Sequence, residues 1–164
     1  MSPVYEEYWE EVTRIFQGDP MMLEHTMRVF AYVQHIADGI SLPEKERKIA
    51  EIAAIFHDVG IEEAERKYGS REGHYQHLEG PPIARRIMEE KGEEKDVLER
   101  VLFIVGHHHD FSAIDGDDFQ VLVEADILVN VLEGNISRDV LGVLLNKVFT
   151  TGVGKRMAQE ILVR

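Results

Sequence analysis

The chain has 164 residues, of which 44% are hydrophobic, and this length and composition are typical of one globular domain with a sizeable core. It has no cysteine, which excludes disulfides, thiolate zinc sites and a cysteine nucleophile, so imidazole and carboxylate groups would have to hold any metal. The formal net charge of −13 argues against a nucleic-acid partner, because proteins that bind nucleic acids present basic faces.

The first residues, MSPVYEEYWEEV, are acidic and aromatic, and they lack the basic and apolar regions of a signal peptide. No apolar stretch reaches the ~18 residues that a membrane span requires. We therefore expect a cytoplasmic protein that has no membrane partner.

Apolar residues recur with a helical period along almost the whole chain, which predicts an all-α fold. The pattern predicts helices over roughly 3–17, 20–37 and 43–58, followed by a polar loop over 62–80 that contains one short helical piece. Pro81 and Pro82 are expected to begin a helix that ends near residue 91.

Further helices are expected over roughly 94–108, from an Asp117 or Asp118 cap to 132, from a Ser137 cap to 149, and close to the last residue. No linker or internal repeat interrupts this pattern. We therefore predict a single domain over 1–164, folded as a compact bundle of about seven to eight helices.

Two polar residues interrupt apolar helical stretches. His25 lies in MLEHTMRVF, where a lone histidine is more often a surface residue or a hydrogen-bonded core residue than a metal ligand. Asp126 lies in VLVEADILVNVL, and buried carboxylates are rare unless they are paired or bind a cation. Alternatively, Asp126 shares a narrow polar face with Glu124 or Asn130.

Two clusters of polar residues stand where predicted helices end. His57 and Asp58 lie in IFHDVGI, where they could cap a helix or form half of a metal site. Three histidines, 107–109, follow VLFIV, where imidazoles would favour the negative end of the helix dipole. Neighbouring helical residues point about 100° apart, so only one or two of these three could face a common centre.

A single divalent cation would explain the polar residues on three apolar helices together. If His25, His57, Asp58 and Asp126 converge, they offer two imidazoles and two carboxylates, a set that suits Mn, Fe, Ni, Zn or Mg. Such a set leaves one or two coordination positions open for water and substrate.

The order H…HD…D resembles the HD-domain superfamily of metal-dependent phosphohydrolases. EHTMRVF, FHDVG and EADILVN resemble three of its motifs, within a motif core of about 20–135. The resemblance implies an HD-domain bundle in which His25, His57, Asp58 and Asp126 are the metal ligands. It further implies that a metal-activated water attacks the phosphorus of a small phosphomonoester or a nucleotide.

Some branches of this superfamily bind a second metal. Here IVGHHH indicates His107 and His108 as its ligands, together with His77, which lies three residues before Gly80. Those branches often have histidine four residues before the glycine, where this chain has Gln76, so the number of metals stays open.

The resemblance also suggests individual roles. Asp58 would orient or deprotonate the water, and His107 or His108 would hold a second metal or protonate the leaving oxygen. Arg28, Lys67 and Arg71 are candidates to bind the substrate phosphate, and the alternative for each is a solvated surface charge.

Several HD phosphohydrolases have lysine or glutamate three residues after the aspartate of the doublet, where this chain has Ile61. A non-catalytic nucleotide-binding module therefore remains an alternative, and so does a di-iron oxygenase, which would require His77 as a ligand. The sequence is also compatible with a homodimer.

Overall fold

The computed structural model describes residues 3–164, and it describes side chains from residue 5 onward. This part of the chain folds into helices and contains no strand, which confirms the predicted all-α class. Its elements are α1 (Pro3–Ile15), α2 (Pro20–Gly39), α3 (Glu44–Phe56), α4 (Ile61–Tyr68), α5 (Gly73–Glu90), α6 (Lys95–His107), the 3-10 helix η1 (Phe111–Ala113), α7 (Asp117–Leu132), α8 (Arg138–Lys147) and α9 (Gly152–Leu162).

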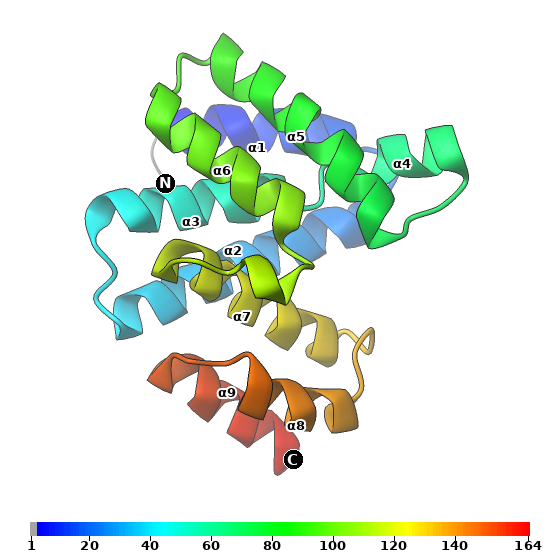
Figure 1. Ribbon diagram of the computed structural model, residues 1–164. Coiled ribbons are helices and arrows are strands. Elements are labelled where there is room, and N and C mark those ends of the chain that lie inside the picture. Colours follow the sequence, from blue (N-terminus) through cyan, green and yellow to red (C-terminus); the bar gives the residue numbers. More distant parts are fainter. Residues whose placement is uncertain (1–2) are drawn as a thin grey trace.

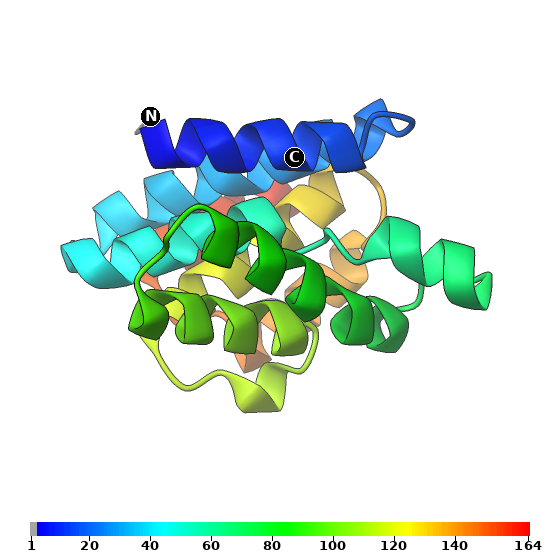
Figure 2. The same cartoon turned by 90° about the horizontal axis from the view of Figure 1, so that it is seen from above.

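Three helices form the centre of the bundle. α2, α3 and α7 all pack against one another, and α6 joins them by packing on α3 (Figure 1). α1 covers one side of this centre, while α4 and the start of α5 project from the body (Figure 2). The centre therefore brings residues from three distant parts of the sequence to one place.

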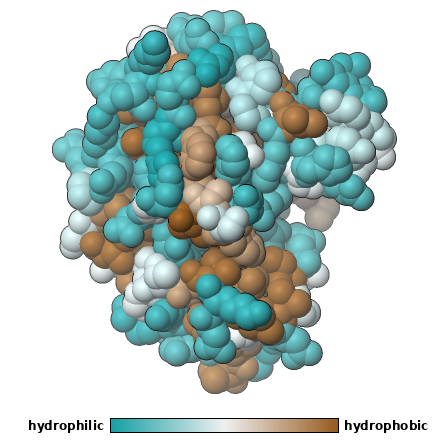
Figure 3. All heavy atoms as spheres, viewed as in Figure 1, coloured by the Kyte–Doolittle hydropathy of each residue, from teal (hydrophilic) through white to brown (hydrophobic). Residues whose placement is uncertain are grey.

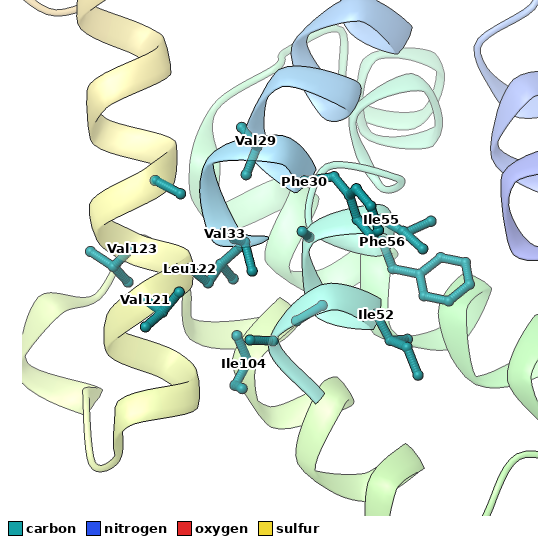
Figure 4. Packing of buried hydrophobic residues seen from close by; sticks show 14 of the residues in the cluster. Val29, Phe30, Val33, Ile52, Ile55, Phe56, Ile104, Val121, Leu122 and Val123 are labelled. Atoms are coloured by element: carbon teal, nitrogen blue, oxygen red, sulfur yellow. The ribbon is translucent and has the colours of Figure 1, made fainter. Parts of the chain in front are cut away.

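The core consists of aliphatic and aromatic side chains that follow the helical period. Val33 of α2 lies beside Leu122 of α7, and Ile52 and Phe56 of α3 belong to the same buried cluster (Figure 4). Each of these four side chains is buried, and burying one contributes roughly 1.5–3 kcal/mol. This packing fixes the relative positions of α2, α3 and α7.

α7 is buried along nearly its whole length, and its buried acid Glu124 has a structural role. The carboxylate of Glu124 is fully buried and accepts hydrogen bonds from the backbone N–H groups of Thr150 and Thr151 at 2.8 and 3.1 Å. The side chain of Gln120 donates to the same carboxylate at 2.7 Å. Glu124 thus ties α7 to the segment before α9.

The predicted loop over 62–80 contains the one short helical piece that was expected, but the loop is shorter than predicted and the predicted helix start at Pro81 is wrong. α4 forms within that segment and ends at Gly69, which has a φ of 65° and donates its N–H to the carbonyl of Glu65. α5 then begins at Gly73 and continues through both prolines. The prolines remove only two N–H donors, and packing of α5 against α4 and α6 maintains the helix.

One predicted helix cap is confirmed and the other is wrong. Ser137 caps α8, as predicted, because its hydroxyl accepts from the N–H of Val140 at 3.2 Å. Neither aspartate caps α7, since both lie inside its first turn and Asp118 instead pairs with Arg100 at 2.8 Å.

Hydrophilic residues cover much of the face shown in Figure 3. On the face in Figure 3, apolar side chains gather mainly in the lower part, where α8 and α9 lie. Among the residues that the structure describes, no helix is both long and apolar enough to cross a bilayer.

Candidate metal centre

Four side chains from three separate helical regions converge at the centre of the bundle. His25 comes from α2, His57 and Asp58 follow the end of α3, and Asp126 comes from α7. Each offers one ligand atom, and these atoms all lie within 4.8 Å of one another. We call these four residues the first group, and they are the four that the sequence predicted to meet.

The ligand atoms of the first group face one another. The Nε2 atom of His25 lies 3.2 Å from an Asp126 oxygen and 3.3 Å from an Asp58 oxygen. The Nε2 atom of His57 lies 3.1 Å from Asp58 and 3.3 Å from Asp126. The two imidazoles therefore point into the same small space as the two carboxylates.

The other ring nitrogens are held from outside the group. Nδ1 of His57 lies 2.7 Å from the carbonyl oxygen of Ala54, to which it donates. Its Nε2 atom is buried and has no hydrogen-bond partner of good geometry. The side chain of Asn130 donates to the Asp126 carboxylate at 3.0 Å. These contacts leave metal-ligating atoms directed inward.

The charges of the first group are strongly coupled. Burial alone would lower the pKa of His25, but the carboxylates of Asp126 and Asp58 raise it to about 10. Burial alone would raise the pKa of Asp58, but neighbouring His57 holds it well below its usual range. Without a metal, protonated imidazoles therefore neutralise the buried carboxylates.

Three histidines form a second group beside the first. His77 comes from α5, and His108 and His109 follow the end of α6. One ring nitrogen from each lies within 4.8 Å of the others. The Nε2 atoms of His77 and His108 are buried without a hydrogen-bond partner, as expected at a site that needs a further atom.

Asp58 lies between the two groups. One of its oxygens faces the imidazoles of His25 and His57, and the other lies 3.5 Å from Nε2 of His108. A carboxylate in this position can contribute one oxygen to each of two neighbouring metals.

The prediction that His107 is a ligand is wrong, because the structure places this residue outside both groups. Its Nδ1 atom donates to the carbonyl of Phe103 at 2.7 Å, and its ring stacks on Phe103 at 4.4 Å between centroids. His107 is the last residue of α6, so its side chain stays on the helix face of Phe103. His109 occupies the place that the sequence had assigned to His107.

Two glycines let the ligand-bearing segments approach closely. A Cβ atom on Gly60 would lie 2.5 Å from the backbone nitrogen of Gly80, which is much closer than a carbon can approach. A Cβ atom on Gly73 would lie 2.7 Å from Nδ1 of His109. Because Gly60 has no Cβ atom, the turn after Asp58 can pack directly against α5. Because Gly73 has none, the imidazole of His109 has room beside it.

His25, Asp58 and Asp126 of the first group line an open cleft of about 1190 Å³, and His57 lies behind them. The cleft wall includes Arg28 and Arg71, which the sequence predicted to bind substrate, and Ile61. Lys67 is not among the lining residues, and its ammonium group lies 2.8 Å from Glu79 instead. The structure therefore brings two of the three predicted cations to the cleft.

Three cleft residues escaped the sequence analysis as functional candidates: His109, Gln76 and Glu133. His109 was hidden among three consecutive histidines. Gln76 was noted only for not being histidine, yet it is 6% exposed, lines the cleft, and has a carbonyl oxygen without a partner. The sequence did not single out Glu133, because Asp126 in the preceding helix was already the acidic candidate in that part of the chain.

Comparisons with known proteins support this description. The sequence pattern of the HD domain family matches residues 22–136. A solved structure from an uncultured Thermotogales bacterium, described as a predicted HD superfamily hydrolase, is similar, with a TM-score of 0.68 and 21% sequence identity. The similarity covers 94% of this chain and 83% of that one. No curated protein matches the chain.

Proposed function

The chain belongs to the HD domain family, and from this premise we propose that it is a metal-dependent phosphohydrolase acting on a small phosphomonoester or a nucleotide. One observation carries the proposal: two imidazoles and two carboxylates converge, and three of these four side chains line an open cleft. The description of the structural neighbour as a predicted hydrolase supports the same reaction class.

The residues present fit a divalent cation. His25, His57, Asp58 and Asp126 would hold one ion, and the unpartnered nitrogens of the second group would hold another next to Asp58. These donors suit Mn, Fe, Ni, Zn or Mg. When bound, such an ion would acidify a water molecule and offset the charge that develops on phosphoryl oxygens.

The protein's own groups would then orient the reactants. Asp58 faces both groups and would align the attacking water through its carboxylate. The low pKa of Asp58 favours this orienting role over proton abstraction, since His57 offsets the effect of burial and keeps the acid ionised. His109 lines the cleft and replaces His107 as the imidazole that faces the substrate.

Two arginines are placed to bind phosphate oxygens. Arg28 lies at the cleft wall and is held by Glu133 at 2.7 Å, and Arg71 is held by Asp19 at 3.2 Å. Each guanidinium has five N–H donors, so these pairs leave donors for a substrate. The rest of the wall includes Met21, Met22, Tyr32 and Leu132, which supports an organic leaving group of nucleotide size.

A screen of phosphate esters tests the proposal. The purified protein would be incubated with p-nitrophenyl phosphate and with nucleoside mono-, di- and triphosphates, with Mn²⁺, Mg²⁺, Co²⁺, Ni²⁺ or Zn²⁺ present. We expect phosphate release with at least one pair, and its loss in His57→Ala and Asp126→Ala. Full activity in both variants would refute the site. Nucleotide binding without any hydrolysis would instead support a non-catalytic module.

The second group also favours one alternative reaction. Together with the first group it supplies enough ligands for two irons, as a di-iron oxygenase requires. Two irons per purified chain and substrate-dependent consumption of dioxygen would support that function over hydrolysis.

A further inference from the structure

Glu133 is the first residue after α7, and its carboxylate contacts two functional side chains at once. One oxygen lies 2.7 Å from Nδ1 of His25, and the other lies 2.7 Å from Nη1 of Arg28. The side chains of Glu133 and His25 are only 17% and 7% exposed, so solvent screens the contact between them less than it screens a surface ion pair. The sequence separates Glu133 from both partners by more than one hundred residues.

The contact with His25 has a specific consequence for metal binding. The Nε2 atom of His25 points at Asp58 and Asp126, so this nitrogen is the one that would meet a metal. A carboxylate at Nδ1 accepts the N–H there, which leaves the Nε2 lone pair free for the metal and fixes the ring orientation. The other imidazole of the first group, His57, has only a neutral backbone carbonyl at its Nδ1 atom.

We propose that Glu133 is a positioning residue that orients His25 for the metal and, through the same carboxylate, fixes Arg28 at the cleft wall. The inference rests on the proposed function in one respect, since it takes the first group as a metal site. It adds that one acid links a metal ligand to a phosphate-binding cation. A change at Glu133 therefore alters metal affinity as well as substrate affinity.

The end of α7 holds Glu133 in place. The N–H of Glu133 donates to the carbonyl of Val129 at 2.9 Å, and the N–H of Asn135 donates to the carbonyl of Asn130 at 2.8 Å. The side chain of Asn135 also donates to that of Asn130 at 3.1 Å, and Asn130 in turn donates to Asp126. The same turn of chain therefore supports His25 and Asp126 from one side.

The chain offers a matched control for the charge at Arg28. Glu24 also contacts Arg28, at 3.4 Å, but its side chain is 64% exposed and has no described contact with His25. Replacing either acid by glutamine removes one negative charge beside Arg28. Only the change at Glu133 removes the charged acceptor from His25.

The first test is a Mn²⁺ titration followed by electron paramagnetic resonance. We expect Glu133→Gln to weaken Mn²⁺ binding roughly 10- to 100-fold, the range typical for a group that orients a metal ligand. Glu24→Gln should stay within about twofold of the wild type, because an exposed ion pair contributes little. Thermal unfolding of the metal-free variants checks that both are folded. Equal effects of the two substitutions, or wild-type affinity in Glu133→Gln, would overturn the proposal.

The second test uses ¹⁵N NMR of the histidine rings in the Zn²⁺-loaded protein. The wild type should show His25 protonated at Nδ1 and bound through Nε2, and Glu133→Gln should lose this uniform signature. Coordination through Nδ1 of His25 would overturn the proposal. A protein that loses metal affinity in Glu133→Gln but hydrolyses no phosphate ester would retain this inference and remove the proposed function. A wild type that binds neither metal would remove both.

Discussion

The two groups of candidate ligands share Asp58, yet they are built differently. The first group contains two carboxylates, and all four of its residues are buried between central helices. The second group contains only imidazoles and opens to solvent through His109, whose side chain is 41% exposed. The difference predicts that a divalent cation would bind tightly at the first group, and more weakly and with faster exchange at the second group.

Charge explains the expected difference in affinity. Two carboxylates can neutralise a divalent cation, whereas the second group contains no carboxylate of its own and lies 3.5 Å from the outward oxygen of Asp58. The location of the ligands in the fold should increase the difference in affinity. Two of the four ligands of the first group lie within helices α2 and α7, whereas two of the three histidines of the second group follow the end of a helix. Backbone there is fixed by fewer hydrogen bonds.

The largest expected effect is on the rate of hydrolysis, which a substitution in the first group should lower more than a substitution in the second group. Asp126→Ala removes a ligand of the first group and should lower phosphate-ester hydrolysis by at least about 100-fold, more than the loss of a supporting residue costs. His109→Ala should lower it less and reduce bound metal from two ions to one per chain. Steady-state rates and metal analysis measure both. Equal losses of activity would contradict the difference between the groups.

The next prediction concerns the stability of the metal-free protein. Asp126→Asn leaves buried, protonated His25 and His57 with one carboxylate less, and breaking a buried ion pair costs about 3–5 kcal/mol. His109→Gln changes a half-exposed residue and should alter the free energy of unfolding by less than about 0.5 kcal/mol. Urea unfolding in the presence of a chelator compares them. Similar values would show that the carboxylates do not hold charged imidazoles.

The dependence of metal binding on pH should also differ. The pKa of His25 is raised to about 10 and that of His57 is raised well above its usual range, so a metal must displace up to two protons, and the apparent affinity of the first group should rise by up to about a hundredfold per pH unit between about pH 6 and 8. Burial, with help from His108, lowers the pKa of His77 to about 4, so the second group should change little over this range. Calorimetric Mn²⁺ titrations at several pH values would measure both sites.

The same shift predicts how the metal-free protein responds to pH. The pKa of His25 is higher in the folded chain than its ordinary value of 6.5. Its stabilising contribution is therefore fully present below about pH 6.5 and is lost as the pH rises through about 10. Chelated protein whose unfolding midpoint rose over that interval would contradict the assignment of His25 as protonated.

The smallest expected effect comes from Gly73→Ala. The new methyl group would lie 2.7 Å from Nδ1 of His109 and would push this ring aside, so binding at the second group should weaken by roughly tenfold or less. Gly142→Ala is the matched control, because nothing lies within 4 Å of its Cβ position in α8. The control should leave metal binding unchanged and stabilise the helix by up to about 1 kcal/mol.

The sequence predicted the all-α fold from its helical period, His25 and Asp126 because they disturb apolar helices, and His57 and Asp58 through the resemblance of the H…HD…D order to a known family. His25 and Asp126 stand where a hydrophobic residue would be more stable, and such a position is visible without a structure. The side chains at helix ends could not be assigned in this way. Whether His107 or His109 faces the centre depends on where α6 ends, and one residue turns a side chain by about 100°.

The segment from α4 to α5 was mispredicted for a related reason. Glycine and proline indicated a loop and a helix start, but neighbouring helices stabilise α5 through Pro81 and Pro82. The role proposed for Glu133 depends on a contact between residues more than one hundred positions apart. No local pattern encodes such a contact, so only the folded structure brings it to light.

The close contact between Gly60 and Gly80 has a mechanical consequence for the centre. Gly60 follows Asp58 by two residues, and Gly80 follows His77 by three, so backbone meets backbone between the carriers of the two groups. Side-chain rotamers can adjust within each group, but the backbone contact between Gly60 and Gly80 prevents the two segments from moving closer together. The two groups should therefore move as one rigid body, and heating should disrupt them together in a single cooperative step.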